Sequence, residues 1–526
     1  MKRTLKTLRL TPPSLATLFL TLALLWALFQ PLLSGDLGWH IRVGQFWLER
    51  GTVPVTNFLC YPALTHPWVT HEWLSGVLFA LLDQAGGLKL LILVRGLLFV
   101  ATLTSLYQLG KRLGAEPLLL AFLLLLSMLT LALHVSLRPW LFSNLLLVIC
   151  LGLTEQIRSR SGSEPLLWLY VGILGLWINL HGGFVVGVAL FGLTLLEWIR
   201  QGRRQEGLGG RRLRMLKGLG FGFATFAVLL FHPHGLEGLL LPLRYALGES
   251  QSGLALTREI KEWGPLELDS FFGGVWMVWV GLGGLAMLIS PVARARPEVP
   301  LAVLFCLLSL QAVRHLPIAG LLLFPMIAEG LLEPLGRWLR RQEGRGMRFV
   351  EGLSRLEGQA TSGTLLLLLV LGLGLYGLDT RTATFEQSRM QGKGYPLQVV
   401  LRLAQLPPKH LLNHYDWAGL VAWKAPQQPL FITPVNDAYP RALFEDFFDM
   451  LNLSPGWEKR LEQYEVERVL LPSSSALVAQ LKQHGDWQVL EELEGACLLE
   501  RKPALTPPES DSAGEIPLLQ PLPLRN

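Results

Sequence analysis

Carboxylate and imidazole side chains lie close together in two short stretches near the N-terminus. Asp36 and His40 are four residues apart, which places them on one face of a helix, and His71 is followed directly by Glu72. A carboxylate in such a stretch can act as a general base that takes a proton from an attacking hydroxyl. It can equally cap a helix or complement the positive end of its dipole. From spacing alone, both roles stay open for Asp36 and Glu72.

Cationic and imidazole side chains stand at the ends of apolar stretches farther along the chain. They are Arg138, His181, His232, His234, Arg314 and His315. Ionisable residues at membrane depth are costly and usually serve a function, although residues at helix ends can also reach water and anchor the helix. A metal site that combines His232 and His234 with His181 or His315 is an open alternative.

The composition indicates a membrane protein. Of the 526 residues, 51% are hydrophobic and only 16% are charged, and the mean hydropathy is +0.40. These values exclude a soluble enzyme, a disordered protein and a disulfide-stabilised scaffold. The net charge of +6 comes from basic residues in short loops between apolar runs. That distribution is typical of cytoplasmic loops and gives no reason to expect nucleic-acid binding.

The apolar runs predict about eleven membrane spans, since a span needs about 17 to 20 apolar residues. They cover 12–33, 88–110, 117–134, 139–156, 165–181, 183–199, 214–231, 271–290, 299–314, 316–333 and 362–378. The run 72–84 is too short to span and is predicted to be an interfacial helix. This assignment makes the N-terminus and every basic cluster cytoplasmic and puts all the histidines on the outer side.

Three regions follow from this layout. Residues 1–379 form the transmembrane domain, and its first outer loop, 34–87, carries interfacial helices. In that loop Trp39, Val43 and Trp47 form an apolar stripe, so helix 36–50 is expected to lie flat on the membrane.

Residues 380–502 alternate β-rich stretches, including 429–433, 468–471, 488–490 and 496–501, with helical ones. This alternation predicts a soluble α/β domain outside the membrane. Residues 503–526 are rich in proline and have no periodicity, so we expect a disordered tail. The predicted fold is an α-helical polytopic membrane protein with this C-terminal α/β domain.

In the first outer loop and in several later motifs, the sequence resembles the GT-C superfamily. Its protein mannosyltransferase-like members are integral membrane enzymes that take a sugar from a polyprenyl-phosphate donor. It is most similar to a bacterial multi-spanning family placed near this superfamily. The motifs that carry the resemblance are Asp36…Trp39-His40, His71-Glu72-Trp73-Leu74, Arg138-Pro139-Trp140-Leu141-Phe142-Ser143, Asn179-Leu180-His181-Gly182-Gly183-Phe184, Arg314-His315-Leu316-Pro317 and Asn413-His414-Tyr415-Asp416-Trp417-Ala418-Gly419.

The resemblance implies that Asp36, just after the first span, is the catalytic base. Glu72 is the second predicted catalytic residue and is expected to hold substrate. GT-C enzymes commonly have two neighbouring acids in this loop, whereas Gly35 and Leu37 flank a lone Asp36 here. The second acid is therefore Glu72 or a residue of another loop such as Glu262, and the use of a divalent metal ion stays open. Arg138 and Arg314 are assigned to the donor phosphate. The full set of predicted substrate-binding residues is His40, His71, Arg138, His181, Arg314 and His315.

We therefore expect a bacterial inner-membrane glycosyltransferase that works on the outer face and uses a glycan, a lipid or a protein as acceptor. Membrane lipids are further expected partners. One rival is a transporter or flippase for a lipid-linked intermediate, which predicts midplane acids and paired repeats of broken helices. The other rival is a non-catalytic membrane scaffold subunit.

Overall fold

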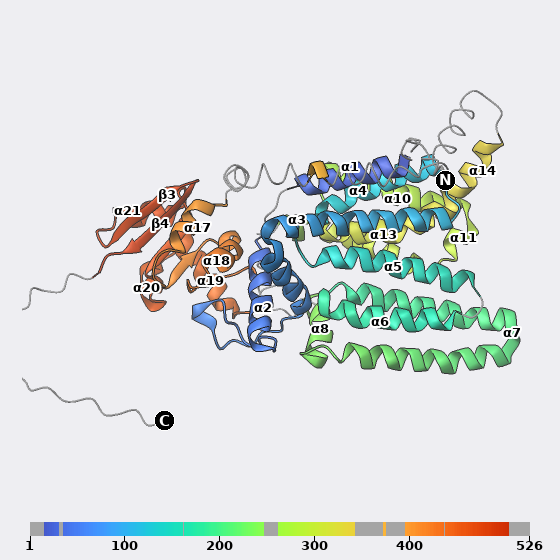
Figure 1. Ribbon diagram of the computed structural model, residues 1–526, viewed down its shortest axis with the longest axis horizontal. Helices are drawn as coiled ribbons and strands as arrows, with labels where there is room; N and C mark the ends of the chain where they lie inside the picture. Colours follow the sequence, from blue (N-terminus) through green and yellow to red (C-terminus); the bar gives the residue numbers. More distant parts are fainter. Residues whose placement is uncertain are drawn as a thin grey trace, which may run out of the picture.

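The computed structural model describes residues 15–30, 35–160, 163–246, 261–341, 372–374, 395–435 and 437–503. A bundle of long helices runs along the long axis of the molecule, and a small α/β unit adjoins one end (Figure 1). Between the two lies α2 (Leu37–Arg50), which runs across the direction of the bundle. We call the end of the bundle next to α2 its outer end.

The bundle is built from helices apolar enough to cross a membrane. Six stretches of the described chain have the necessary length and composition: Trp73–Arg112, Pro117–His134, Trp140–Ser159, Phe184–Gly202, Phe271–Ile289 and Val313–Leu339. Shorter apolar helices are Phe19–Phe29, Glu164–Leu180 and Val299–Gln311. Each of these stretches overlaps a predicted span, but Trp73–Arg112 also includes the predicted interfacial helix 72–84, and the predicted span 214–231 has no counterpart among them. The predicted span 362–378 lies outside the described residues except for 372–374.

Several bundle helices begin with proline in the first turn, where the missing N–H has no helical partner to lose. These are α4 (Pro117–Leu131), α6 (Glu164–Leu180), α12 (Val299–Gln311), α13 (Leu316–Ile327) and α14 (Glu333–Arg340). The other helices of this part are α1 (Leu15–Phe29), α3 (Trp73–Arg112), α5 (Trp140–Ser159), α7 (Phe184–Leu229), α8 (Gly235–Ala246), α10 (Phe271–Ile289) and α11 (Pro291–Arg294).

Two predicted spans, 183–199 and 214–231, both fall within α7, because the chain folds back on itself there. Nη1 of Arg214 donates to the carbonyl oxygen of Trp198 at 3.0 Å, although the two residues are 16 positions apart. A straight helix of that length would separate them by about 24 Å. Figure 1 shows the two limbs side by side, and the second limb returns the chain to the outer end.

α3 is bent at Gly87, whose backbone leaves the helical region at φ 58° and ψ −153°. Glycine adopts a positive φ without the steric cost that other residues incur. The part before the bend packs on α2, where the rings of Trp47 and Trp73 lie 5.8 Å apart, and the part after it enters the bundle (Figure 1). The predicted division between the interfacial helix 72–84 and the span 88–110 thus falls at the observed bend.

The described residues after the bundle contain a four-stranded sheet with the strand order β1-β2-β4-β3. β1 pairs with β2 in parallel, and the other two pairs are antiparallel. The strands are β1 (Leu411–Asn413), β2 (Arg468–Pro472), β3 (Trp487–Leu493) and β4 (Ala496–Arg501). The helices are α17 (Leu397–Leu403), α18 (Ala418–Lys424), α19 (Arg441–Leu451), α20 (Trp457–Gln463) and α21 (Ala476–Gln483).

The strand predicted at 429–433 is wrong. Leu430 makes only isolated bridges, to Leu411 and to Cys60 of the first outer loop. This segment therefore joins the α/β unit to the loop instead of extending the sheet. The predicted boundary at 379/380 and residues 504–526 lie outside the described part of the chain.

Two residues of the apolar stripe of α2, Trp39 and Val43, are covered by protein, and the third, Trp47, is half-buried. Trp39 and Val43 are buried in a core shared with residues of the α/β unit such as Phe431 and Tyr439. α2 is consequently enclosed between the first part of α3 and the C-terminal unit. This packing fixes the helix that follows Asp36.

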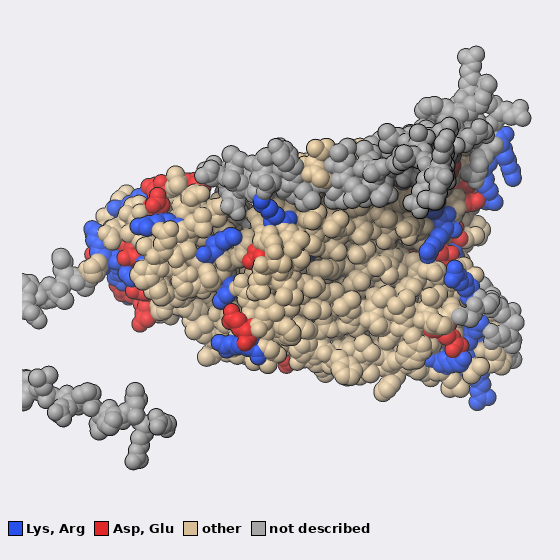
Figure 2. Space-filling model, in the orientation of Figure 1, with Lys and Arg blue, Asp and Glu red and all other residues tan. Residues whose placement is uncertain are grey.

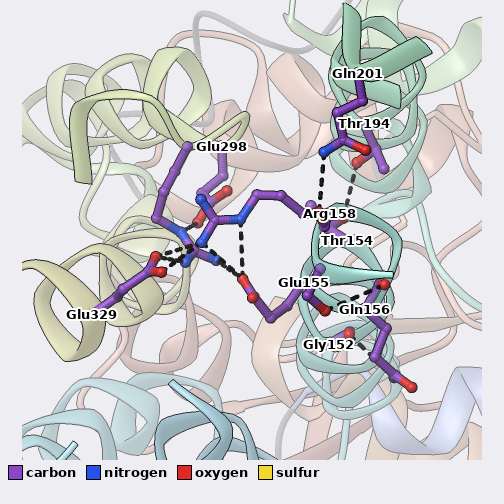
Figure 3. Close-up of polar contacts among 11 residues, drawn as sticks. Gly152, Thr154, Glu155, Gln156, Arg158, Thr194, Gln201, Glu298 and Glu329 are labelled. Carbon is purple, nitrogen blue, oxygen red and sulfur yellow. Dashed lines mark hydrogen bonds and ion pairs between the residues drawn. The ribbon is translucent and has the colours of Figure 1, made fainter. Parts of the chain in front are cut away.

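On the face shown in Figure 2, charged side chains lie towards the two ends of the bundle, and its middle is covered by uncharged residues. At the end remote from α2, ion pairs join α5, the connection between α11 and α12, and the π-helical turn Ala328–Leu332 (Figure 3). Arg158 lies 2.6 Å from Glu329. Arg296, which is 1% exposed, contacts Glu155, Glu298 and Glu329. The network holds three segments together far from the predicted site residues.

Candidate active site

Ionisable side chains from separate segments meet where α2 joins the outer end of the bundle. They come from the beginning of α2, the beginning of α3, the α4–α5 connection, the α6–α7 turn, and two short 3-10 helices, Lys261–Trp263 and Val313–His315. The residues brought together are Asp36, His40, His71, Glu72, Arg138, His181, Glu262 and Arg314. Of the residues predicted from the sequence, only His315 stands apart from this cluster.

Arg138 links two carboxylates at the centre of the cluster. Its Nε lies 2.6 Å from Oδ2 of Asp36, and its Nη1 lies 3.0 and 2.9 Å from the two carboxylate oxygens of Glu262. The guanidinium also lies over the ring of Trp140, 4.7 Å from the ring centroid. Such charge-assisted contacts fix both acids relative to one cation. The sequence assigned Arg138 to a donor phosphate, whereas here its partners are carboxylates.

Asp36 does not cap α2 with its side chain, although it occupies the N-cap position. Its Oδ1 instead accepts a hydrogen bond from the Trp39 indole at 3.3 Å. Burial raises the pKa of the Asp36 carboxyl, and the nearby Arg138 guanidinium opposes this only in part. The side chain is still 18% exposed. Asp36 is thus a reachable carboxylate with an increased affinity for a proton, which suits a general base.

Glu72 likewise occupies an N-cap position without making a side-chain capping bond. Three imidazoles surround it: Nε2 of His40 and of His71 each lie 3.5 Å from its oxygens, and Nε2 of His181 lies at 3.4 Å. The capping alternative therefore fails for Asp36, whereas Glu72, at the N-cap position of α3, still lies where a carboxylate complements the helix dipole. The carboxylate of Glu72 orients the imidazole rings of His40, His71 and His181. The sequence predicted only that these residues lie near one another.

The three imidazoles differ in their affinity for a proton. Burial raises the pKa of Glu72, but the neighbouring imidazoles, His71 foremost, outweigh this and keep it well below its usual range. Burial lowers the pKa of His40 to about 3 and that of His181 to about 4. For His71, the attraction to Glu72 outweighs burial and raises the pKa. His71 is therefore the imidazole most suited to carry a charge beside Glu72.

A second set of hydrogen bonds holds His181 in place from the bundle side. Its Nδ1 lies 2.7 Å from Oγ of Ser143, and the Trp177 indole donates to that same hydroxyl at 2.6 Å. Both residues lie on buried faces of α5 and α6. His181 therefore presents Nε2 to Glu72 in a fixed orientation.

Arg314 belongs to the same electrostatic cluster as Asp36, Glu72, Arg138 and Glu262. Its guanidinium stacks 4.1 Å from the centroid of the Trp263 ring. Within the part of the chain that the structure describes, no carboxylate forms an ion pair with it. Arg314 is thus a cation held in place by an aromatic ring, with no carboxylate partner among the described residues. His315 points elsewhere, since its ring packs edge-on against Phe305 of α12 at 5.8 Å.

The histidine pair that the sequence left open for metal binding is engaged in other contacts. Nε2 of His234 lies 2.9 Å from Oγ1 of Thr70, and Nε2 of His232 lies 3.4 Å from the carbonyl oxygen of His71. Among the described residues, no group of three or more His, Cys, Asp or Glu is arranged to hold a metal ion.

Sequence reasoning missed several residues of the cluster. Trp39 and Trp263 contact Asp36 and Arg314, but tryptophan is common enough at membrane interfaces that it gives no specific signal. Tyr395 of the C-terminal part lies within electrostatic range of Asp36 and Arg138. Only the long-range fold brings this tyrosine to the site.

No protein-family model and no curated protein matches the sequence. Several solved structures resemble the fold, including the following two. One is the oligosaccharyltransferase of Archaeoglobus fulgidus, solved with zinc and sulfate, at 11% identity and a TM-score of 0.48; the match covers 94% of this chain and 74% of that one. The other is ArnT from Cupriavidus metallidurans in the apo state, at 14% identity and a TM-score of 0.47; the match covers 92% of this chain and 97% of that one.

Proposed function

We propose that the chain is an integral membrane glycosyltransferase that moves a sugar from a polyprenyl-phosphate donor to a hydroxyl group on the outer face of a bacterial inner membrane. The observation that carries the proposal is the pairing of Asp36 with Arg138 at 2.6 Å, in one cluster with Arg314, which has no carboxylate partner among the described residues. A base and an available cation are the two groups that this reaction needs. The acceptor is a glycan, a lipid or a protein.

In the proposed reaction, Asp36 accepts the proton of the acceptor hydroxyl as its oxygen attacks the anomeric carbon of the sugar. A new glycosidic C–O bond forms while the bond from that carbon to the phosphate oxygen breaks, with inversion at carbon. The polyprenyl phosphate leaves with the electron pair. The increased proton affinity of buried Asp36 assists the first event, and Arg314 stabilises the negative charge that develops on the phosphate.

Arg138 has a supporting role in this scheme. By contacting Asp36 and Glu262 together, it sets the direction of the base and reduces the repulsion between two neighbouring carboxylates. Glu72 with His40, His71 and His181 forms a second polar group in the cluster, and its imidazole N–H groups and carboxylate suit the hydroxyls of a sugar.

The test compares Asp36→Asn with Asp269→Asn, which alters an exposed acid of the outer segment that also carries Glu262. Membranes that contain each variant are incubated with polyprenyl phosphates bearing a radiolabelled hexose or pentose, and the products are separated by thin-layer chromatography. We expect Asp36→Asn to lower transfer by about 100-fold or more, with expression unchanged, and Asp269→Asn to match the wild type.

Full transfer by Asp36→Asn would contradict the assignment of the base. If the wild-type chain transfers no sugar but moves the labelled lipid between leaflets of proteoliposomes, the proposal fails in favour of a flippase. Neither transfer nor movement would favour a non-catalytic membrane subunit.

A further inference from the structure

The C-terminal α/β unit touches the polypeptide around Asp36 at backbone level. α18 crosses the beginning of α2 so closely that a methyl group added at Gly38 would overlap the carbonyl oxygen of Gly419. A methyl group added at Gly419 would in turn overlap the carbonyl oxygen of Gly35. Only glycine allows this approach, because any Cβ would force the two segments apart.

The contact continues on both sides of this crossing. The carbonyl oxygen of Asp416 would lie 3.1 Å from a Cβ at Gly35. Farther along α18, the Trp423 indole donates to Oδ2 of Asp83 on α3 at 2.9 Å. Segment 413–419 therefore reaches the residues before and after Asp36, and α18 is anchored separately on α3.

The chain is also held on the other side of Asp36, where α1 ends. Arg95 of α3 is fully buried, and its Nη2 donates to the carbonyl oxygens of Ala27 and Gln30 at 2.6 and 3.2 Å. A guanidinium at the C-terminus of a helix satisfies carbonyl groups that lack helical partners and complements the dipole. The connection from α1 to α2 thus has one fixed point before Asp36 and another directly beside it.

We infer that segment 413–419 is a positioning element for the catalytic base, with Gly419 as the residue that sets how far Asp36 stands from Arg138. This inference rests on the proposed function of Asp36. It gives a structural role to the Asn413-His414-Tyr415-Asp416-Trp417-Ala418-Gly419 motif, which has no role in the proposed reaction. Gly419 touches no reacting atom in this scheme and acts only through the backbone of residues 35–38.

Displacement of Asp36 should change the pH dependence of kcat, whereas a simple loss of stability should not. The groups that face its carboxylate are Arg138 from the α4–α5 connection, Trp39 on α2, Glu262 and Arg314 from the two 3-10 helices, Glu72 at the start of α3, and Tyr395. Of these, Arg138 is the main group that favours the charged carboxylate. Moving Asp36 away from Arg138 therefore raises its pKa further and shifts the acid limb of the kcat–pH profile to higher pH.

The experiment compares Gly419→Ala and Gly38→Ala with Gly485→Ala, an exposed glycine of the same unit with no neighbouring atom near its Cβ position. Transfer is measured with the radiolabelled polyprenyl-phosphate sugar that supports wild-type activity, per amount of folded protein. We expect kcat to fall by about 100-fold, as a displacement of about 1 Å in a catalytic group can cause. The KM for the donor should stay within about twofold, and the acid limb should move to higher pH.

Trp423→Phe provides a milder variant in case the alanine substitutions do not fold. It removes the hydrogen bond to Asp83 but retains the packing of the ring, and it should move kcat and the acid limb in the same directions by smaller amounts. The inference is overturned if the variants lose only folded protein while the kcat and pH profile of the remainder match the wild type. Activity of Asp36→Asn in the same assay would show instead that the proposed function itself is wrong.

Discussion

Arg138 and Glu262 form a two-oxygen ion pair, with Nη1 of Arg138 at 3.0 and 2.9 Å from the carboxylate oxygens of Glu262. The same guanidinium contacts Asp36 through Nε. Glu262 therefore competes with Asp36 for one cation and also repels its charge. The position of the acid limb of the kcat–pH profile should therefore depend on the interactions among Asp36, Arg138 and Glu262.

Glu262→Gln should shift the acid limb of the kcat–pH profile to lower pH. Glu262 raises the pKa of Asp36 through charge repulsion, so its neutralisation makes Asp36 easier to ionise. The profile of the purified chain in detergent is compared with that of Glu267→Gln, which changes an exposed acid of the same segment. An unchanged limb in Glu262→Gln would show that Asp36 does not sense this neighbour.

Arg138→Gln should have the opposite effect. It removes the cation that opposes the burial of Asp36, so the acid limb moves to higher pH and kcat at neutral pH falls by about 100-fold. Part of the activity should return as the pH is raised, because Asp36 then ionises without its partner. Loss of activity at every pH, with the protein still folded, would argue that Arg138 acts on the substrate instead.

Arg314→Gln should lower kcat/KM for the polyprenyl-phosphate donor by about 100- to 1000-fold, the usual effect of removing one group that stabilises developing charge. Arg314→Lys should recover only part of this, since lysine lacks the planar guanidinium that stacks on Trp263. Arg244→Gln alters an exposed arginine on α8 and serves as the control. Equal kinetics for Arg314→Gln and Arg244→Gln would remove Arg314 from the site.

The sequence predicts much of this arrangement because its signals are local. Long apolar runs specify helices whatever surrounds them, and Gly87 marks the division of α3. Asp36, Glu72, Arg138 and Arg314 could be grouped because each stands where an apolar run begins or ends on the outer side. That rule needs only span order and the positive-inside distribution.

Pairing within the site could not be predicted in the same way. Glu262 meets Arg138 across 124 positions, and its surroundings in the sequence have no apolar periodicity. The same holds for the contact of Gly38 with Gly419, which depends on how the α/β unit docks on α2. His315 shows the converse error, because a residue adjacent to Arg314 turns its side chain away to Phe305.

Glu72→Gln should destabilise the protein more at about pH 6 than at about pH 8. The raised pKa of His71 contributes stability that is complete below the ordinary histidine value of 6.5 and is lost as the pH rises through the folded value. The lowered pKa of Glu72 contributes stability that is present above the ordinary glutamate value of 4.5. The pair is therefore strongest between these values.

The test of this pair measures the Tm of wild type and Glu72→Gln in detergent across that range. The difference between them should shrink as His71 loses its proton at higher pH. A difference that is constant with pH would mean that Glu72 acts through hydrogen bonds alone.

Arg296→Met should destabilise the end of the bundle remote from α2 without changing the chemistry at the outer end. Glu298 is 0% exposed, and Arg296 is its ion-pair partner within the described chain. Removing one partner of a buried ion pair costs about 3 to 5 kcal/mol, because the other charge is left buried and unpaired. Arg337→Met is the control: its side chain is 60% exposed and pairs with Glu333, so its loss should cost about 0.5 kcal/mol or less.

Adding Glu298→Gln to Arg296→Met should recover part of the lost stability, since the stranded charge is then removed as well. Resistance to unfolding in a titration with sodium dodecyl sulfate reports the effect, and transfer activity per folded molecule should stay at the wild-type level for all of these variants. Equal resistance of Arg296→Met and Arg337→Met would show that the network in Figure 3 does not stabilise the bundle. Recovery of stability without any change in activity would separate the role of this end from that of the cluster around Asp36.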